Sequence, residues 1–448
     1  MIKASNIDAD SLHRDERMGW TGDAHAFATT ANYLYDTAGF WRGWHKDIWF
    51  EQQAASMIPP VTVPVVPASN FTQPAAVWGD VVVANPFNYY QAFGDLAMLA
   101  EQYDSAQAWI DTGIPRNEVG LWKAGRQFGD WLDPKSPPDD PGAATTAVLL
   151  VADSYLIRMT ELLANISQDL SRDDLASKYR GQRDDLLTEF HNTWVADDGS
   201  LANETQTAYA LAVNFALLPE EQEANEAGAK LRQIVADNDY LVGTGFAGTP
   251  ALGAALTKIG GADDFYSMLL QTQVPSWLYQ VAMNGTTTWE RWNSLEPNGS
   301  VNAGEMTSFS EYNLPRSRDD ICLHRLTDHY AFGSVSDWIH TNIGGLSPAE
   351  PGWKRVNVAP IPGGNITSAN SKYISRYGEV SVRWYFESNE DAITAHRNGF
   401  HLEVQLPPNT RATVTVPSGR GENGVETSEP VDVGSGYHEW FVSGYQKP

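Results

Sequence analysis

The chain has 448 residues, of which 42% are hydrophobic, and its formal net charge is −26. That length predicts two or more domains, each large enough to bury a core. The negative charge makes nucleic-acid binding and attachment to anionic membranes poor expectations, and no apolar run reaches the roughly 20 residues that span a bilayer. The only cysteine, Cys322, excludes an intrachain disulfide, and the ten histidines lack the spacing of metal ligands. We therefore expect neither a metal nor another cofactor.

Apolar residues spaced three and four apart predict helices in the first part of the chain. The predicted helices cover 24–56, 85–113, 143–168 and 171–195, then a pair broken at Pro219, and the stretches "TPALGAALTKIG" and "DDFYSMLLQ". The segment 171–195 is the clearest, because its apolar residues share one face, acids fill its first turn and Ser171 is a predicted N-cap. Proline punctuates 57–74, which we expect to be an extended loop. Long helices joined by Gly-, Pro- and Trp-rich loops predict an all-α domain of paired helices.

The pattern changes after residue 345. Apolar residues alternate strictly in "EVSVRWYF", and "HLEVQL", "RATVTV" and "YHEWFV" repeat this period of two. These segments predict a small antiparallel β domain, which we interpret as a sandwich. We therefore expect an α domain over 1–345 and a β domain over 346–448.

Four predicted loops share a composition of Trp, Gly and acid. They are "RDERMGWTGD" (14–23), "VWGD" (77–80), "QFGDWLDP" (127–134) and "TTTWERW" (286–292). Aromatic rings stack on the C–H faces of sugars, and hydrolysis of a glycosidic bond needs one carboxylic acid and one carboxylate. Each segment alone is better explained as an ion-pair cluster or a Trp packed on a turn, but the four together favour a carbohydrate-cleaving site.

The first of these segments, extended to "RDERMGWTGDAHAFATTANYLYDTAGFWRGW", is similar to the signature of the α-L-rhamnosidases of glycoside hydrolase family 78. "FGDWLDP", "TQTAYALAVNFALLPEE", "TGFAGTP", "TTTWERWNSLEPNGS" and "HYAFGSVSDWI" follow in family order. The resemblance extends from residue 10 to residue 418. It implies an (α/α)6 barrel followed by a C-terminal β-sandwich, and an inverting hydrolase that removes terminal α-L-rhamnose from a glycoside or polysaccharide.

The resemblance also implies roles for individual residues. Glu16 matches the family's general acid, and Glu290 matches the general base that activates water. The residues that match the rhamnose pocket are Asp10, Arg14, Trp20, Asp23, Trp78, Trp131 and His329. Trp78 and Trp131 would form its hydrophobic wall. Inversion requires the two catalytic carboxyl groups to lie roughly 6.5–9.5 Å apart, with space for a water molecule between them.

Two departures from the family pattern bear on these expectations. Family members have several hundred residues before this signature, so we expect a fragment or truncated gene product whose barrel lacks its first helix. The N-terminus has no apolar core of a signal peptide, and an extracellular location is compatible with a missing N-terminal region. In addition, residues 310–328 separate "TSF" from "HYAFG", which we interpret as a translated intron, with an ordinary loop insertion as the alternative.

Two other functions stay open. The chain could bind rhamnosides without hydrolysing them if the fold is incomplete, or it could act on another sugar, since barrels of this kind have many specificities. The sequence does not indicate the group to which the rhamnose is attached.

Overall fold

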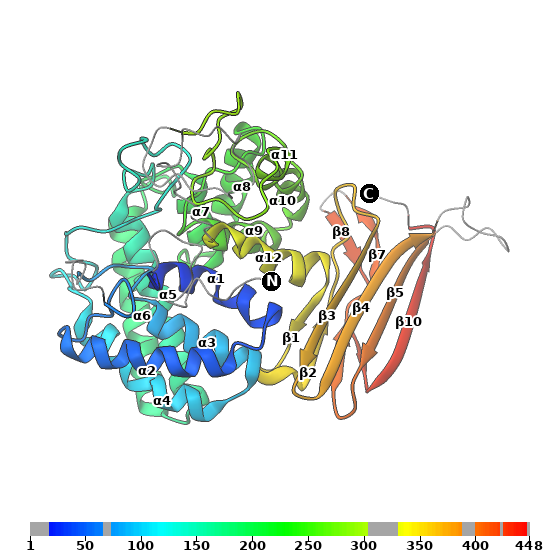
Figure 1. Cartoon of the computed structure of the whole chain (residues 1–448), viewed down its shortest axis with the longest axis horizontal. Coiled ribbons are helices and arrows are strands. Elements are labelled where there is room, and N and C mark those ends of the chain that lie inside the picture. Colours follow the sequence, from blue (N-terminus) through cyan, green and yellow to red (C-terminus); the bar gives the residue numbers. More distant parts are fainter. Residues whose placement is uncertain (1–17, 66–72, 303–329, 388–398, 422–423, 446–448) are drawn as a thin grey trace, which may run out of the picture.

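The computed structural model describes residues 18–65, 73–302, 330–387, 399–421 and 424–445. Helices make up the chain as far as Ile343, and strands begin at Leu346. The helical part and the strands lie side by side, with α12 and β1 at the junction (Figure 1). The order of elements confirms the prediction of a mainly helical chain that ends in sheets.

Six helices of the described residues form a closed ring. They are α1 (Thr21–Leu34), α3 (Val81–Phe93), α5 (Val148–Asp169), α7 (Gln206–Asn214), α9 (Thr249–Lys258) and α12 (Val335–Trp338). Each packs against the next, and α12 returns to α1. Two short turns extend α12, a 3-10 turn before it (Ala331–Ser334) and a π turn after it (Ile339–Ile343).

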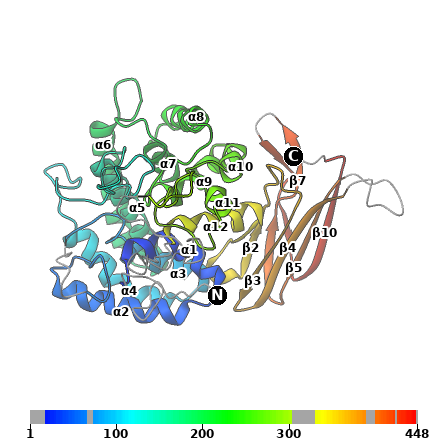
Figure 2. The same cartoon turned by 45° about the horizontal axis from the view of Figure 1, so that its top comes forward.

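A second set of helices covers the outside of this ring, as Figure 2 shows. These are α2 (Ala38–Ala54), α4 (Leu96–Ala108), α6 (Asp173–Trp194), α8 (Glu221–Asp237) and α10 (Ala262–Leu269). Each outer helix follows an inner one along the chain, so the architecture is a series of helical hairpins. The short helix α11 (Trp277–Ala282) begins the loop region that leads towards Glu290.

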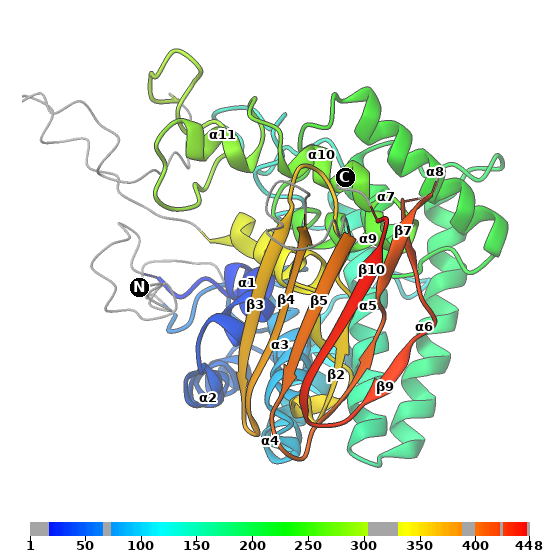
Figure 3. The same ribbon diagram turned by 90° about the vertical axis from the view of Figure 1, so that its right-hand side faces the viewer.

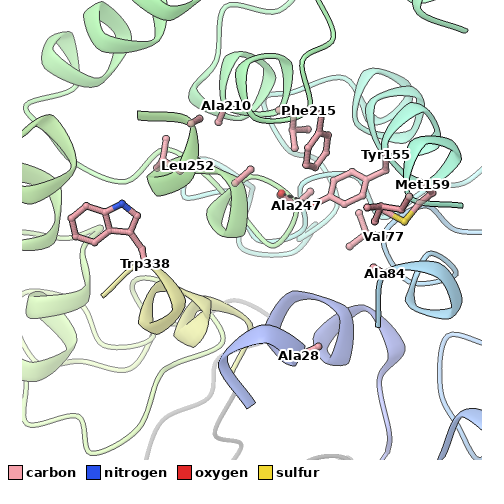
Figure 4. Packing of buried hydrophobic residues seen from close by; sticks show 14 of the residues in the cluster. Ala28, Val77, Ala84, Tyr155, Met159, Ala210, Phe215, Ala247, Leu252 and Trp338 are labelled. Carbon is pink, nitrogen blue, oxygen red and sulfur yellow. Dashed lines mark hydrogen bonds between the residues drawn. The ribbon is translucent and has the colours of Figure 1, made fainter. Parts of the chain in front are cut away.

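Position in the ring explains the difference between inner and outer helices. The inner helix α5 is buried around most of its circumference, and the hydroxyls of Ser154, Thr160 and Ser167 donate to carbonyl oxygens four residues earlier. A helix hydroxyl that bonds to its own backbone needs no other partner inside a core. The outer helix α6 instead has one apolar stripe, as its sequence predicts. Small side chains such as Ala28, Ala84, Ala210 and Ala247 help to keep the centre narrow (Figure 4).

Three helix predictions need correction. The helix predicted over 24–56 is interrupted between Leu34 and Ala38, so two helices form there. The helix predicted over 85–113 is interrupted between Phe93 and Leu96, so α3 and α4 form there, and a π turn (Trp109–Gly113) follows α4. Ser171 does not cap α6, which begins at Asp173 with Arg172 at its N-cap. Ser171 has a φ of 55° and its N–H donates to the carbonyl of Gln168, so it closes the end of α5 in the left-handed conformation typical of helix C-termini. The break at Pro219 is confirmed, since α7 and α8 flank it.

Two four-stranded sheets follow the helices. The first has the order β1-β2-β6-β9 and contains β1 (Leu346–Pro348), β2 (Arg355–Val358), β6 (Arg411–Val414) and β9 (Val431–Val433). The second has the order β10-β5-β4-β3, with β3 (Ser368–Ser375), β4 (Gly378–Glu387), β5 (Gly399–Leu406) and β10 (Gly436–Ser443), and faces the viewer in Figure 3. A separate hairpin pairs β7 (Pro417–Gly421) with β8 (Gly424–Thr427).

The predicted strands all form, but their pairing is partly different. β5 and β6 are consecutive in sequence yet belong to different sheets, and β6 pairs parallel to β2. The other pairs are antiparallel. Alternation selects the buried face of β4, since Val380, Val382 and Trp384 are fully buried and the residues between them are not. The same rule holds for Leu402 and Val404 of β5.

The sheets are fastened to the helical ring by side chains from both parts. The indole N–H of Trp384 donates to the carbonyl of Ile343 over 2.6 Å, and Tyr266 of α10 donates to the carbonyl of Ile361 over 2.5 Å. The backbones also touch at Gly94 and Gly352, where a Cβ on Gly94 would lie 3.0 Å from the Cα of Gly352. Gly94 has a φ of 64°, so both its conformation and its surroundings favour glycine.

We predict that Gly94→Ala lowers the free energy of unfolding by about 1–2 kcal/mol, because it places a Cβ in the left-handed conformation and against Gly352. Urea denaturation monitored by circular dichroism measures this change. The matched control is Gly43→Ala in α2, where a Cβ has open space. It should raise stability by up to about 1 kcal/mol, since alanine is the better helix former. Equal effects of the two substitutions would contradict the prediction.

Candidate active site

The site begins where α1 begins. The backbone of Trp20 pairs with Thr62, and the hydroxyl of Thr21 donates to the carbonyls of Pro60 and Val61, each over 3.1 Å. Trp20 is partly buried, and Asp23 lies in the first turn of α1 with an exposed fraction of 2%. The extended segment after α2 therefore fixes the position of both predicted pocket residues.

The indole of Trp78 packs against the first turn of α1. A Cβ on Gly22 would come within 2.4 Å of its indole, so only glycine fits beside Trp78 at this position of α1. The turn that carries Trp78 is closed by Asp80, which accepts hydrogen bonds from the backbone N–H of Val77 (2.6 Å) and the indole N–H of Trp109 (2.9 Å). Trp78 is thus held rigidly against the residues that precede Asp23.

Trp131 lies close to Trp78, with one ring between them. Phe128 contacts both indoles, at centroid distances of 4.4 Å to Trp78 and 5.5 Å to Trp131. The carbonyl of Trp131 accepts a hydrogen bond from the N–H of Phe246 over 2.9 Å. Trp131 is partly buried, whereas Trp78 is almost fully buried. The structure therefore brings together the two tryptophans predicted to form the wall of the pocket.

Glu290 lies in a segment anchored on both sides. The backbone N–H of Trp289 donates to the side-chain oxygen of Gln280 over 3.1 Å, and the indole N–H of Trp292 donates to the carbonyl of Thr244 over 2.9 Å. Glu290 itself is 4% exposed. A short segment fixed at two tryptophans holds its central carboxyl group in a defined place, as a catalytic carboxylate requires.

A row of aromatic rings joins this segment to Trp78. Neighbouring ring centroids lie 6.3 Å apart for Trp78 and Phe246, 5.3 Å for Phe246 and Phe332, and 4.2 Å for Phe332 and Trp292. Rings at such distances contribute packing energy beyond their buried area. Trp78 and the Glu290 segment, far apart in sequence, are therefore parts of one cluster.

The remaining predicted site residues lie outside the described part of the chain. These are Asp10, Arg14, Glu16 and His329, together with the segment 310–328 interpreted as a translated intron. Their roles, and the separation of the Glu16 and Glu290 carboxyl groups, stay predictions.

Four further residues of this cluster, Phe128, Asp130, Phe246 and Phe332, are not among the predicted site residues. Phe246 and Phe332 each occur between small residues, in "TGFAGTP" and "HYAFG". An aromatic residue placed directly between glycine and alanine is the signal that could have identified both.

The chemistry available at this cluster is that of carboxylates and aromatic rings. The described residues contain no group of three or more His, Cys, Asp or Glu side chains placed to hold a metal ion. They also contain no helix long and apolar enough to cross a membrane.

A cavity of about 140 Å³ continues from Phe246 along the inside of the ring. His25, Tyr155 and Asp337 also line this cavity. Figure 4 shows Tyr155 pointing towards the segment of Ala247, and the Tyr155 hydroxyl donates a hydrogen bond to the carbonyl of Ala247. Burial lowers the pKa of His25 to about 4, so this histidine is neutral near pH 7. Asp337 also borders a second cavity of about 270 Å³ on the side of the sheets.

The carboxyl group of Asp337, a partly buried residue, differs from those of three buried acids, Asp80, Asp130 and Asp153. Burial raises the pKa values of Asp80, Asp130, Asp153 and Asp337 to about 6. The first three accept hydrogen bonds from named donors. Within the described residues, no side chain or backbone N–H donates to the carboxyl group of Asp337. Its ionised form is therefore the least compensated of the four.

We predict that Asp337→Asn gains stability relative to wild type as the pH rises from 4 to 7. The pKa of Asp337 is raised from its ordinary 3.8 to about 6, so its stabilising contribution is complete below pH 3.8 and is lost as the pH rises through 6. Asparagine does not ionise, so the variant keeps its stability over this range. The difference in the free energy of unfolding between variant and wild type should therefore grow by about 1–3 kcal/mol. Urea denaturation at the two pH values measures it.

Asp80→Asn is the contrasting variant. It disturbs an acceptor that Val77 and Trp109 use, so it should destabilise the protein at pH 7. A stability difference between Asp337→Asn and wild type that does not change with pH would contradict the assignment.

Two protein-family models match this chain. The family model described as bacterial alpha-L-rhamnosidase 6 hairpin glycosidase domain matches residues 4–343, and the one described as bacterial alpha-L-rhamnosidase C-terminal domain matches residues 345–430. A ring of helical hairpins followed by a sheet domain is thus the class of the six-hairpin glycosidases. Within that class, the chain belongs to the bacterial α-L-rhamnosidase family.

Named relatives agree with this assignment. An α-L-rhamnosidase of Streptomyces avermitilis is 33% identical over 98% of this chain and 39% of its own length. The crystal structure of native α-L-rhamnosidase from Aspergillus terreus has 49% identity and a TM-score of 0.87, covering 97% of this chain and 46% of that chain. The Streptomyces avermitilis enzyme complexed with L-rhamnose has 32% identity and a TM-score of 0.81, covering 96% and 39%. This chain spans less than half the length of these relatives.

Proposed function

We propose that the chain is the catalytic region of an inverting α-L-rhamnosidase, with Glu16 as general acid and Glu290 as general base. The observation that carries the proposal is the buried position of Glu290 in a segment that aromatic packing joins to Trp78. The names of the relatives support the choice of α-L-rhamnose as the sugar that is released.

In the proposed reaction, Glu16 donates its proton to the glycosidic oxygen as the bond from that oxygen to the anomeric carbon breaks. The Glu290 carboxylate takes a proton from a water molecule, whose oxygen attacks the anomeric carbon from the opposite face. The products are free L-rhamnose with inverted anomeric configuration and the alcohol to which it was attached.

The other predicted residues have binding roles in this proposal. Trp78 and Trp131 form an apolar wall against the sugar, next to its methyl group. The polar contacts to the sugar are assigned to Asp10, Arg14, Trp20, Asp23 and His329. The substrate is a rhamnose-containing glycoside or polysaccharide.

We also propose that the catalytic domain covers 1–345 and the sheet domain 346–448. In support, the last turn of the ring ends at Ile343 and the first strand begins at Leu346. The hydrogen bond from Trp384 to Ile343 crosses this boundary, so the two domains are expected to unfold together.

We predict that Glu16→Gln and Glu290→Gln each lower kcat for an aryl α-L-rhamnoside by about 10²–10⁴-fold, the usual contribution of a general acid or base. Release of the chromogenic phenol measures kcat. The control is Glu296→Gln in the same loop region, whose carboxylate accepts a hydrogen bond from Asn302 over 2.6 Å, and it should leave kcat within a few-fold. Full activity in either catalytic variant would overturn its role.

We predict that the first L-rhamnose released is the β-anomer, because a single displacement by water inverts the α-glycoside. Proton NMR in the first minutes, before the anomers equilibrate, measures it. Initial release of the α-anomer would show that the carboxylates act by a double displacement instead.

The two alternatives give different results. A chain that binds L-rhamnose in a calorimeter but releases no phenol would be a binding protein. Faster hydrolysis of another aryl glycoside than of the rhamnoside would show a different sugar specificity.

A further inference from the structure

Asp130 is a buried residue that precedes the wall residue Trp131 in sequence, and its side chain joins several segments of the site. Its side chain has an exposed fraction of 0%. The backbone N–H groups of Gly245, Ala247 and Gly248 donate to its carboxyl oxygens over 2.8–2.9 Å, and the hydroxyl of Thr207 donates as well. One carboxylate thus accepts four hydrogen bonds from the segment before α9 and from the first turn of α7.

These hydrogen bonds hold the segment of Phe246 in close contact with the segment of Trp131. A Cβ on Gly245 would lie 2.3 Å from the carbonyl oxygen of Trp131 and 2.4 Å from that of Asp130. The contact therefore tolerates only glycine. Since the carbonyl of Trp131 also accepts the N–H of Phe246, the position of Trp131 depends on the segment that Asp130 holds.

The same segment supports Glu290. The carbonyl of Thr244 accepts the indole N–H of Trp292, two residues after Glu290. From the other side, the guanidinium of Arg291 lies 3.4–3.5 Å from the carbonyl oxygens of 136–138, in the loop that follows Trp131. The Glu290 segment is therefore attached to both loops that the Asp130 carboxylate links.

We propose that Asp130 is a positioning residue that sets the distance between the sugar wall at Trp131 and the carboxylate of Glu290. This inference rests on the proposed function. Removing the carboxylate leaves backbone N–H groups without an acceptor in a place that water does not reach, so the two loops must separate. A displacement of about 1 Å between binding and catalytic groups can lower the rate about 100-fold.

The first test compares Asp130→Asn with Asp153→Asn. Asp153 of α5 is also a buried acceptor, and its two donors, the N–H of Trp122 and the indole N–H of Trp194, lie outside the segments of Trp131, Phe246 and Glu290. Both substitutions should lower stability. Only Asp130→Asn should lower kcat/KM for the aryl rhamnoside, by about 100-fold, with KM raised through Trp131 and kcat lowered through Glu290.

The second test keeps the fold intact. Thr207→Val removes one donor to Asp130 and should lower kcat/KM by about 3–10-fold, whereas Thr207→Ser keeps the hydroxyl and should restore it. If Asp130→Asn does not fold, this pair decides the question. Equal kcat/KM in the valine and serine variants overturns the proposal, as does an Asp130→Asn enzyme as active per folded molecule as Asp153→Asn.

Failure of the proposed function gives a separate result. In that case wild type itself releases no phenol, and the same variants are compared by calorimetry with L-rhamnose. Weaker binding in Asp130→Asn and Thr207→Val, but not in Asp153→Asn, supports the positioning of Trp131. Unchanged binding in all variants, or no binding by wild type, overturns it.

Discussion

Closing the helices into a ring buries most of the surface of inner helices such as α5, and the rest of the molecule follows from this constraint. The inner helix α5 is buried around most of its circumference by apolar side chains and self-bonded hydroxyls, and its Arg158–Glu161 ion pair lies on the narrow part that stays partly exposed. The outer helix α6 instead keeps one apolar stripe. Along the chain, several residues of the candidate site come before the inner helices. Trp20 precedes α1, Trp78 precedes α3, Trp131 precedes α5 and Phe246 precedes α9.

This arrangement gathers helix N-termini around the site. Backbone N–H groups there lack partners within their own helices and carry partial positive charge, which favours acceptors and anions. Asp130 uses this property at α9, where Gly248 is the N-cap. The acidic residues of these loops are thus suited to the partial positive charge at the N-termini of the helices that the loops enter.

Much of the fold could be predicted from the sequence because its signals are local. The stripe of α6, the break at Pro219 and the alternation in β4 each depend on residues a few positions apart. Ser171 was misassigned because its left-handed turn depends on the end of α5 rather than on the start of α6. The parallel pairing of β6 with β2 joins strands separated by more than 50 residues, which no local pattern records.

Some residues of the candidate site could also be named from local sequence. Trp78, Trp131 and Glu290 occur in distinctive motifs, and resemblance to a known family assigned their roles. Phe246, Phe332 and Asp130 become meaningful only after folding. Asp130 accepts hydrogen bonds from backbone N–H groups about 115 residues away in sequence. The two phenylalanines pack against each other and connect aromatic rings that are far apart in the sequence.

The shared carboxylate of Asp130 has a consequence for how such a site can change. Loops at the open end of a barrel are usually regarded as separate units that can be exchanged to alter substrate range. Here the segments around Trp131, Phe246 and Glu290 share hydrogen bonds, so replacing one leaves the others without partners. In natural divergence and in laboratory redesign, these segments should be inherited as a set.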